Sequence, residues 1–143
     1  MLTKFDYTYY DSKSIVKVIL GDYIRSDEEF DNFTDEWSEI NKKRNYILII
    51  DTSNVESINI KYVYKLAQFI KSLKECDFKH LQLTIIMIKN SFVNRLLDML
   101  LYIQSPIATV YIINDFKYID DIFNNKNSDN LLNNPNIKVH LPY

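Results

Sequence analysis

Three short apolar segments alternate with amphipathic segments along the middle of the chain, and this alternation constrains the fold more than any other feature. The segments Tyr46–Asp51, Leu81–Ile88 and Thr109–Ile113 are almost continuously apolar, which is typical of strands buried on both faces. Between them, Asn59–Leu73 and Ser91–Ile103 carry apolar residues at helical spacing. This order predicts parallel strands joined by right-handed helical crossovers.

The N-terminal part predicts antiparallel strands and a further helix. Aromatic and polar residues alternate over Phe5–Tyr10, which indicates a strand, and Ile15–Leu20 indicates a second strand that pairs with it after a polar turn at Asp11–Lys13. Ser26 followed by Glu29 is typical of a capping box, so a helix is expected to begin there. The expected fold is α/β, with a mixed sheet of about five strands (an N-terminal hairpin plus parallel β-α-β-α-β) and about four helices.

The C-terminal part is expected to end the domain and continue as a tail. Phe116–Phe123 predicts a last short helix, so residues 1–123 form the single expected domain. Asn124–Asn136 is polar and rich in asparagine, which is typical of a linker. Within the tail of residues 124–143, Ile137–Leu141 is interpreted either as a short extra strand or as plain tail.

The predicted core uses one apolar stripe from each long helix. Residues three or four apart lie on one helical face, so they are buried together against the sheet. The expected inward residues are Phe30, Phe33, Trp37 and Ile40, then Val63, Leu66, Ala67, Ile70 and Leu73, then Phe92, Leu96, Leu97 and Leu100.

Composition argues against several functional classes. The net charge of −2 argues against a protein that follows a nucleic-acid backbone, and Gly21 is the only glycine, so the glycine-rich loops that cradle phosphates are excluded. Two histidines, His80 and His140, and one cysteine, Cys76, supply neither a catalytic triad nor a zinc site. We therefore expect no enzymatic activity, no metal and no cofactor.

The same composition gives expectations about location. Cys76 cannot form an internal disulfide, and no apolar stretch approaches the roughly 20 residues that span a bilayer, so a cytoplasmic protein without membrane insertion is expected. The abundance of Asn, Ile, Lys and Tyr suggests an AT-rich genome.

Four segments together resemble the STAS domain, the fold of bacterial anti-sigma factor antagonists and of sulfate-transporter tails. Ile15–Ile24 is similar to that family's second strand and following turn, and Asp27–Lys42 occupies the place of its first helix. Ile47–Ser57 is similar to the strand and loop before its signature site, and Ser91–Met99 is similar to its Arg-Leu helix. The resemblance spans residues 5–123, and it implies a regulatory domain that acts by binding other proteins.

The signature site departs from the family pattern. Antagonists carry Asp-Ser-Ser/Thr-Gly there and are phosphorylated on the hydroxyl, whereas this chain reads Asn59-Ile60-Lys61-Tyr62, without the phosphorylatable serine and the glycine. Asn59 can still cap the helix through its side-chain oxygen. Ser57 is the nearest candidate phosphate acceptor, and a loop or capping serine is the alternative interpretation.

The sequence therefore predicts a non-enzymatic regulatory or scaffold domain that binds a protein through the helix after the third strand. The partner would be a kinase, another regulator or a second copy in a homodimer, for which the aromatic N-terminal hairpin offers an edge. Tyr62 and Ile103 have a second interpretation, in which they only widen the buried stripe. The candidate partner-binding residues are Asn59, Ile60, Lys61, Tyr62, Tyr64, Met99 and Tyr102, with Ile103 as a possible extension.

Binding of a small ligand, a nucleotide or a lipid, is the alternative function. Asp51, Asn54 and Asn114 follow predicted strands, at the edge where ligands of open α/β sheets bind. For Asp51, capping of the following turn is the competing interpretation.

Overall fold

A computed structural model describes residues 3–125 and 134–142, and within them six strands form one mixed sheet whose spatial order follows the chain, β1-β2-β3-β4-β5-β6. The strands are β1 (Lys4–Asp6), β2 (Ile15–Ile19), β3 (Tyr46–Asp51), β4 (Leu81–Met87), β5 (Val110–Ile113) and β6 (Ile137–His140). The two outer pairs are antiparallel, and the neighbours from β2 to β5 are parallel. The α/β class with a mixed sheet is thus confirmed, with six strands in place of five.

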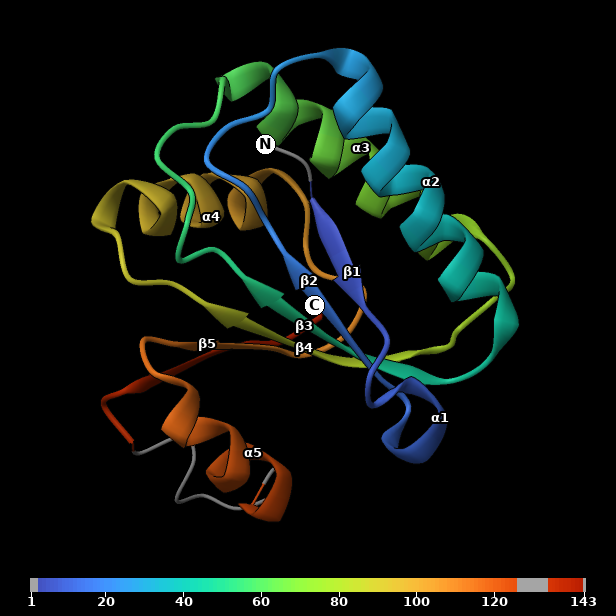
Figure 1. Cartoon of the computed structure of the whole chain (residues 1–143), viewed down its shortest axis with the longest axis vertical. Helices are drawn as coiled ribbons and strands as arrows, with labels where there is room; N and C mark the ends of the chain where they lie inside the picture. Colours follow the sequence, from blue (N-terminus) through green and yellow to red (C-terminus); the bar gives the residue numbers. More distant parts are fainter. Residues whose placement is uncertain (1–2, 126–133, 143) are drawn as a thin grey trace.

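Helices cover the two faces of the sheet unequally. The helical elements are α1 (Tyr10–Lys13), α2 (Asp27–Lys43), α3 (Ile60–Glu75), α4 (Ser91–Ile103), the 3-10 turn η1 (Phe116–Tyr118) and α5 (Ile119–Asn125). The crossover helices α2, α3 and α4 lie together on one face, and α5 lies on the other (Figure 1). Right-handed crossovers that all advance in one direction across a sheet place their helices on the same face.

Each long helix begins at a side-chain cap that the sequence supplies. Ser26 Oγ accepts from the Glu29 backbone N–H at 3.2 Å, and Asn59 Oδ1 accepts from the Lys61 N–H at 3.0 Å. Asn90 Oδ1 accepts from two backbone N–H groups of the first turn of α4, at 2.7 and 3.1 Å. These bonds satisfy donors that a helix start leaves open, so the three helix starts are fixed locally. In a capping box, the Glu29 carboxylate would accept from the backbone N–H of Ser26. Here it accepts instead from the N–H of Arg25, one residue earlier, at 2.5 Å.

The predicted helix stripes form the core, with one exception. Val63, Ala67 and Ile70 of α3 and Leu97 of α4 are buried in one cluster above β4 and β5. Trp37 of α2 belongs to a second cluster on the same side of the sheet. The exception is Phe92, which was expected to point inward and is exposed, while its neighbour Val93 is buried instead.

The N-terminal hairpin pairs as expected, but its first strand is shorter. Asp6 Oδ1 accepts from the backbone N–H and the hydroxyl of Thr8, at 2.9 and 2.5 Å, and this local turn ends β1 after three residues. The expected polar turn is a four-residue helix, α1, which closes at Ser14 with the left-handed φ of 57°. The prediction of a strand reaching Tyr10 is therefore wrong.

The C-terminal strand is confirmed and belongs to the sheet. Ile137–His140 pairs antiparallel with β5 and forms the sheet edge opposite β1, so the segment is more than a tail. The predicted last helix is present as η1 followed by α5. Most of the Asn-rich linker, residues 126–133, lies outside the described residues.

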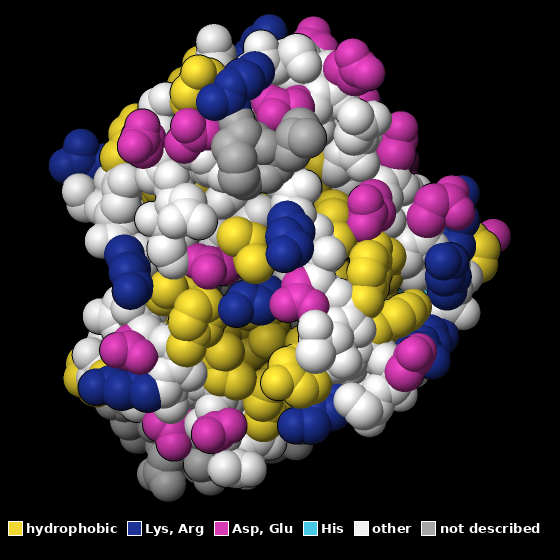
Figure 2. Space-filling model, in the orientation of Figure 1, with side chains coloured by type: hydrophobic (Ala, Val, Ile, Leu, Met, Phe, Trp, Pro, Cys, Tyr) yellow, Lys and Arg dark blue, Asp and Glu magenta, His cyan; other side chains and the backbone are white. Residues whose placement is uncertain are grey.

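The sheet face opposite α2, α3 and α4 is only partly covered. Half-buried Ile15 and Ile47 pack at the margin of a third apolar cluster on this side, which also holds Ile119 of α5. Figure 2 shows apolar side chains gathered in a hollow beside the part of the surface that α5 occupies in Figure 1. Lys17 spans this face with its ammonium group 4.6 Å from the centre of the Phe116 ring.

Candidate functional site

The first turn of α3 presents four of the predicted partner-binding residues at the surface. Asn59, Ile60, Lys61 and Tyr64 are all exposed, and Ile60 and Tyr64 lie one helical turn apart. Tyr64 keeps 51% of its surface exposed although it is a large aromatic residue. The position of this turn is fixed by the Asn59 cap, so the exposed side chains stand on a rigid element.

Tyr62 is buried, which corrects its prediction as a surface residue. Only 4% of Tyr62 is exposed, and its ring stacks on Phe30 of α2 with ring centres 5.3 Å apart. Its hydroxyl donates to Asp27 Oδ1 at 3.0 Å. Tyr62 therefore connects the starts of α2 and α3. Its burial agrees with the second interpretation of this residue, in which Tyr62 widens the buried stripe of α3.

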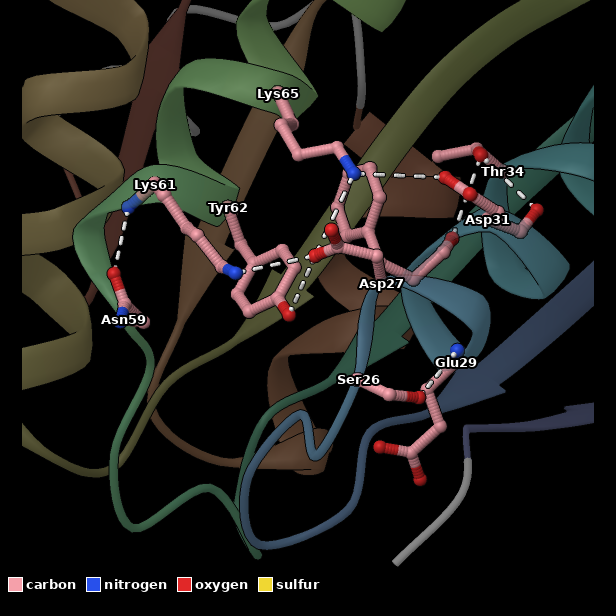
Figure 3. A network of polar contacts seen from close by, with 10 residues as sticks. Ser26, Asp27, Glu29, Asp31, Thr34, Asn59, Lys61, Tyr62 and Lys65 are labelled. Carbon is pink, nitrogen blue, oxygen red and sulfur yellow. Dashed lines mark hydrogen bonds and ion pairs between the residues drawn. The ribbon is translucent and has the colours of Figure 1, made fainter.

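Two lysines of α3 complete this junction between helix starts (Figure 3). Lys61 Nζ lies 3.2 Å from Asp27 Oδ1, and Lys65 Nζ lies 3.8 Å from Asp27 Oδ1 and 3.7 Å from Asp31 Oδ1. The Tyr62 hydroxyl and then the two ammonium groups lower the pKa of the Asp27 carboxyl below its ordinary value of 3.8. The charge of Lys61 is thus directed toward α2, while its stem remains at the surface.

On α4, several large apolar side chains also face solvent. Tyr102 is 93% exposed, and Phe92 and Ile103 are each exposed, whereas Met99 is half-buried against the core. Phe92 was missed as a surface residue because its spacing to Leu96 matches the inward stripe.

Helices α3 and α4 pack side by side, and each leaves large apolar side chains exposed or half-buried. The ammonium group of Lys74 donates to Ser105 Oγ at 2.6 Å and links the C-terminal end of α3 to the segment after α4. We call the apolar side chains that these two helices leave exposed or half-buried the α3–α4 ridge, which consists of Ile60, Tyr64, Phe92, Met99, Tyr102 and Ile103.

The candidate phosphate acceptor, Ser57, is an exposed residue of the loop between β3 and α3. The loop is held by backbone bonds from the Glu56 and Ser57 N–H groups to the Asp22 carbonyl oxygen, at 2.8 and 3.3 Å. Ser57 lies two residues before Asn59, the residue that caps α3. Phosphorylation of Ser57 stays a prediction.

The three candidate ligand-binding residues do not form one site. Asp51 Oδ1 accepts from the Ser53 backbone N–H at 2.9 Å and from the Ser53 hydroxyl, which is the turn-capping role considered as its alternative. Asp51 pairs with Met87 of β4, and Met87 pairs with Ile113, the residue before Asn114. A whole strand thus separates Asp51 from Asn114, which corresponds to roughly 9–10 Å.

An open surface pocket of about 280 Å³, with many polar side chains in its lining, lies beside Asn114; we call it the polar cavity. It is formed at the ends of β4 and β5, at the start of α4 and before β6, and neither Asp51 nor Asn54 contributes to it. The other polar side chains in its lining are those of Lys89, Asn90, Ser91, Asn94, Asn136 and Lys138. Ligand crevices of open α/β sheets form where the strand order reverses, and across the described strands of this sheet the order never reverses.

A second cavity, of about 180 Å³, lies between the sheet and the layer of α2, α3 and α4 and is partly open to the surface, where the exposed Tyr23 lines it. Its walls are almost entirely apolar, with Ile50, Ile86 and Val110 on the sheet side. Leu66 and Leu97 are among the helix residues that cover it. This cavity could not be predicted from the sequence, because its lining residues have the same apolar spacing as a filled core.

Among residues 3–125 and 134–142, no three His, Cys, Asp or Glu side chains come together to hold a metal ion, and no helix has the length and apolarity needed to cross a membrane. Comparison with protein families, curated proteins and solved structures found no match to this chain. The resemblance to the STAS domain therefore stays a prediction.

Proposed function

We propose that this chain is a non-enzymatic regulatory or scaffold module that binds a protein partner through the α3–α4 ridge. The observation that carries the proposal is the exposure of large apolar side chains on two adjacent helices, with Tyr64 and Tyr102 the most prominent. Tyrosine and methionine are enriched at protein interfaces, so exposed side chains of these types favour an interaction site. The resemblance to the STAS domain supports the same function.

The junction of α2 with α3 supports this role because it makes the surface rigid. Tyr62, Asp27 and Lys65 connect the two helix starts, so binding at Ile60 and Tyr64 need not first order the backbone. Little conformational entropy is then lost when a partner binds. A phosphate on Ser57 would stand near the start of α3, where negative charge is favourable, and this supports a regulatory modification there.

The chain offers a matched pair of substitutions for the test. Tyr64→Glu places a charge on the ridge, and Tyr9→Glu places the same charge just before α1 on an equally exposed tyrosine, 55% exposed against 51%. Each variant is used as bait in extracts of the native host, and bound proteins are compared by quantitative mass spectrometry. Sedimentation velocity measures self-association of the same samples.

We expect Tyr64→Glu and Tyr102→Glu to lose the same bound protein, and Tyr9→Glu to retain it. Circular dichroism should show all three variants folded, because the substituted side chains lie at the surface. A partner retained by both ridge variants would refute the proposal. Loss of self-association in Tyr9→Glu alone would place the interface at the N-terminal edge instead.

Small-ligand binding is the second candidate, and the polar cavity beside Asn114 favours it over a site at Asp51. Lys89 and the amide side chains in its lining suit an anionic group such as a phosphate, whereas the ammonium group of Lys138 already pairs with Asp98 at 3.4 Å. Titration with ATP and with inorganic phosphate, followed by the amide resonances of Asn90 and Asn114, tests this function. Unshifted resonances at millimolar phosphate and ATP would exclude it.

A further inference from the structure

We infer that the interior cavity between the sheet and the helix layer is a binding site for a small, neutral, mostly apolar molecule that carries one hydroxyl or carbonyl group, held by the Thr84 hydroxyl. This inference does not depend on the proposed function. The α3–α4 ridge lies on the outer side of the helices, whereas Thr84 is a sheet residue that lines the cavity.

Charge in the lining excludes an ionic ligand from this cavity. Glu29, at the start of α2, is the only residue with a formal charge among the described lining residues, and its carboxylate already accepts from the Arg25 N–H. No lysine, arginine or histidine of residues 3–125 and 134–142 lines the space, so a carboxylate or phosphate would be desolvated without a counter-charge from this part of the chain. The ligand class is therefore uncharged.

Thr84 supplies an unused hydrogen-bonding group. It is 6% exposed and sits on β4, paired with Leu48 of β3 and Val110 of β5, so it lies at the middle of the sheet. Among the buried hydroxyls that line the cavity, Tyr62 donates to Asp27, and Thr52 donates to the Met87 carbonyl oxygen at 2.7 Å. The Thr84 hydroxyl has no hydrogen-bond partner within the described part of the chain.

The Thr84 hydroxyl is unpaired but is not among the fully enclosed polar atoms, so its oxygen is accessible from the cavity, whose apolar walls offer no good site for an ordered water molecule. A buried water molecule makes about three hydrogen bonds, whereas this space provides one free hydroxyl among apolar walls. A ligand with an apolar body and one polar atom fills the space and also pairs with Thr84. Apolar cavities of roughly 150 Å³ hold a benzene ring, so 180 Å³ accommodates a ring with one substituent.

Three small probes of similar shape test the inference on the full chain. Phenol has the ring and the hydroxyl, benzene has the ring alone, and benzoate adds a charge. Binding is measured by isothermal titration calorimetry and by methyl resonances of Ile86, Leu97 and Val110, which report occupation of the cavity itself.

In the wild-type chain we expect benzene to bind, phenol to bind roughly two- to tenfold more tightly because of one added hydrogen bond, and benzoate not to bind. Thr84→Val keeps the shape of the side chain and removes its hydroxyl. This variant should bind benzene and phenol equally.

Leu97→Phe, which adds volume at the cavity wall, should abolish binding of both rings. Thr84→Val keeps the inference testable if Leu97→Phe does not fold. Absence of methyl shifts with benzene and phenol would overturn the inference, as would binding of benzoate as tight as that of phenol. A phenol preference that persists in Thr84→Val would overturn the role of Thr84.

Discussion

Truncation of Leu97 distinguishes a core with an internal cavity from a filled one. Leu97 is buried on α4, and one side of its side chain borders the 180 Å³ cavity. Leu48 on β3 is also buried, but it lies outside the cavity lining and packs in the second core cluster. The substitutions Leu97→Ala and Leu48→Ala remove the same atoms from these two surroundings.

The expected magnitudes follow from what each side chain touches. Removal of three buried carbons costs about 2.4 kcal/mol in transfer free energy, and a newly opened cavity raises the cost of Leu→Ala up to about 5 kcal/mol. Leu97 already lacks packing partners on its cavity side, so Leu97→Ala should lower the free energy of unfolding by about 2–3 kcal/mol. Leu48→Ala should lower it by about 4–5 kcal/mol.

Urea denaturation followed by circular dichroism measures both values. With an m-value of about 2 kcal/mol/M, Leu97→Ala should lower the midpoint by about 1–1.5 M, and Leu48→Ala by about twice as much. Equal losses in the two variants would show that no space lies beside Leu97. A loss below about 1 kcal/mol for Leu97→Ala would remove Leu97 from the core.

Three further changes test the contacts that hold the helices and the sheet together. Ser26→Ala removes the cap of α2 and should cost about 1 kcal/mol in thermal or urea unfolding, whereas no change would show that the cap is replaced by water. The Tyr46 hydroxyl accepts from the indole N–H of Trp37 at 3.0 Å and donates to Asn41 Oδ1 at 2.8 Å. Tyr46→Phe leaves both of these buried groups unpaired, so it should lower the free energy of unfolding in urea by about 1–3 kcal/mol. Because the folded state lowers the pKa of Asp27, the stabilisation from its contacts is present above pH 3.8 and is lost as the pH falls through the folded value. Unfolding measured from about pH 5 down to pH 2.5 should therefore depend less on pH in Asp27→Asn than in the wild type, and identical slopes would contradict this assignment.

Local signals in the sequence were sufficient for most of the fold. Helix α4 has the predicted bounds, because Asn90 caps its start and the chain leaves the helix before Pro106. The central strands were recognisable as continuous apolar runs. By contrast, the short β1 and the helix α1 depend on side-chain contacts such as that of Asp6 with Thr8, which compete with the alternating pattern.

The candidate site was only partly predictable, because exposure on a helix depends on which neighbours cover it. Periodicity assigned Tyr64 to the surface correctly, but the same rule placed Phe92 in the core. It could not decide whether Tyr62 was covered, since that depends on Phe30 of α2, a residue distant in sequence. The interior cavity was not predictable either, because a stripe of apolar residues does not reveal how completely it packs.

The strand order of the sheet repeats the order of the strands along the chain, and this has a consequence for how the protein folds. Each strand can be added at the outer edge of those already assembled, and no strand has to insert between two that have paired. Every pairing then closes only the loop to the preceding strand, which limits the entropy lost at each step. Assembly can therefore begin at any adjacent strand pair and extend outward in both directions.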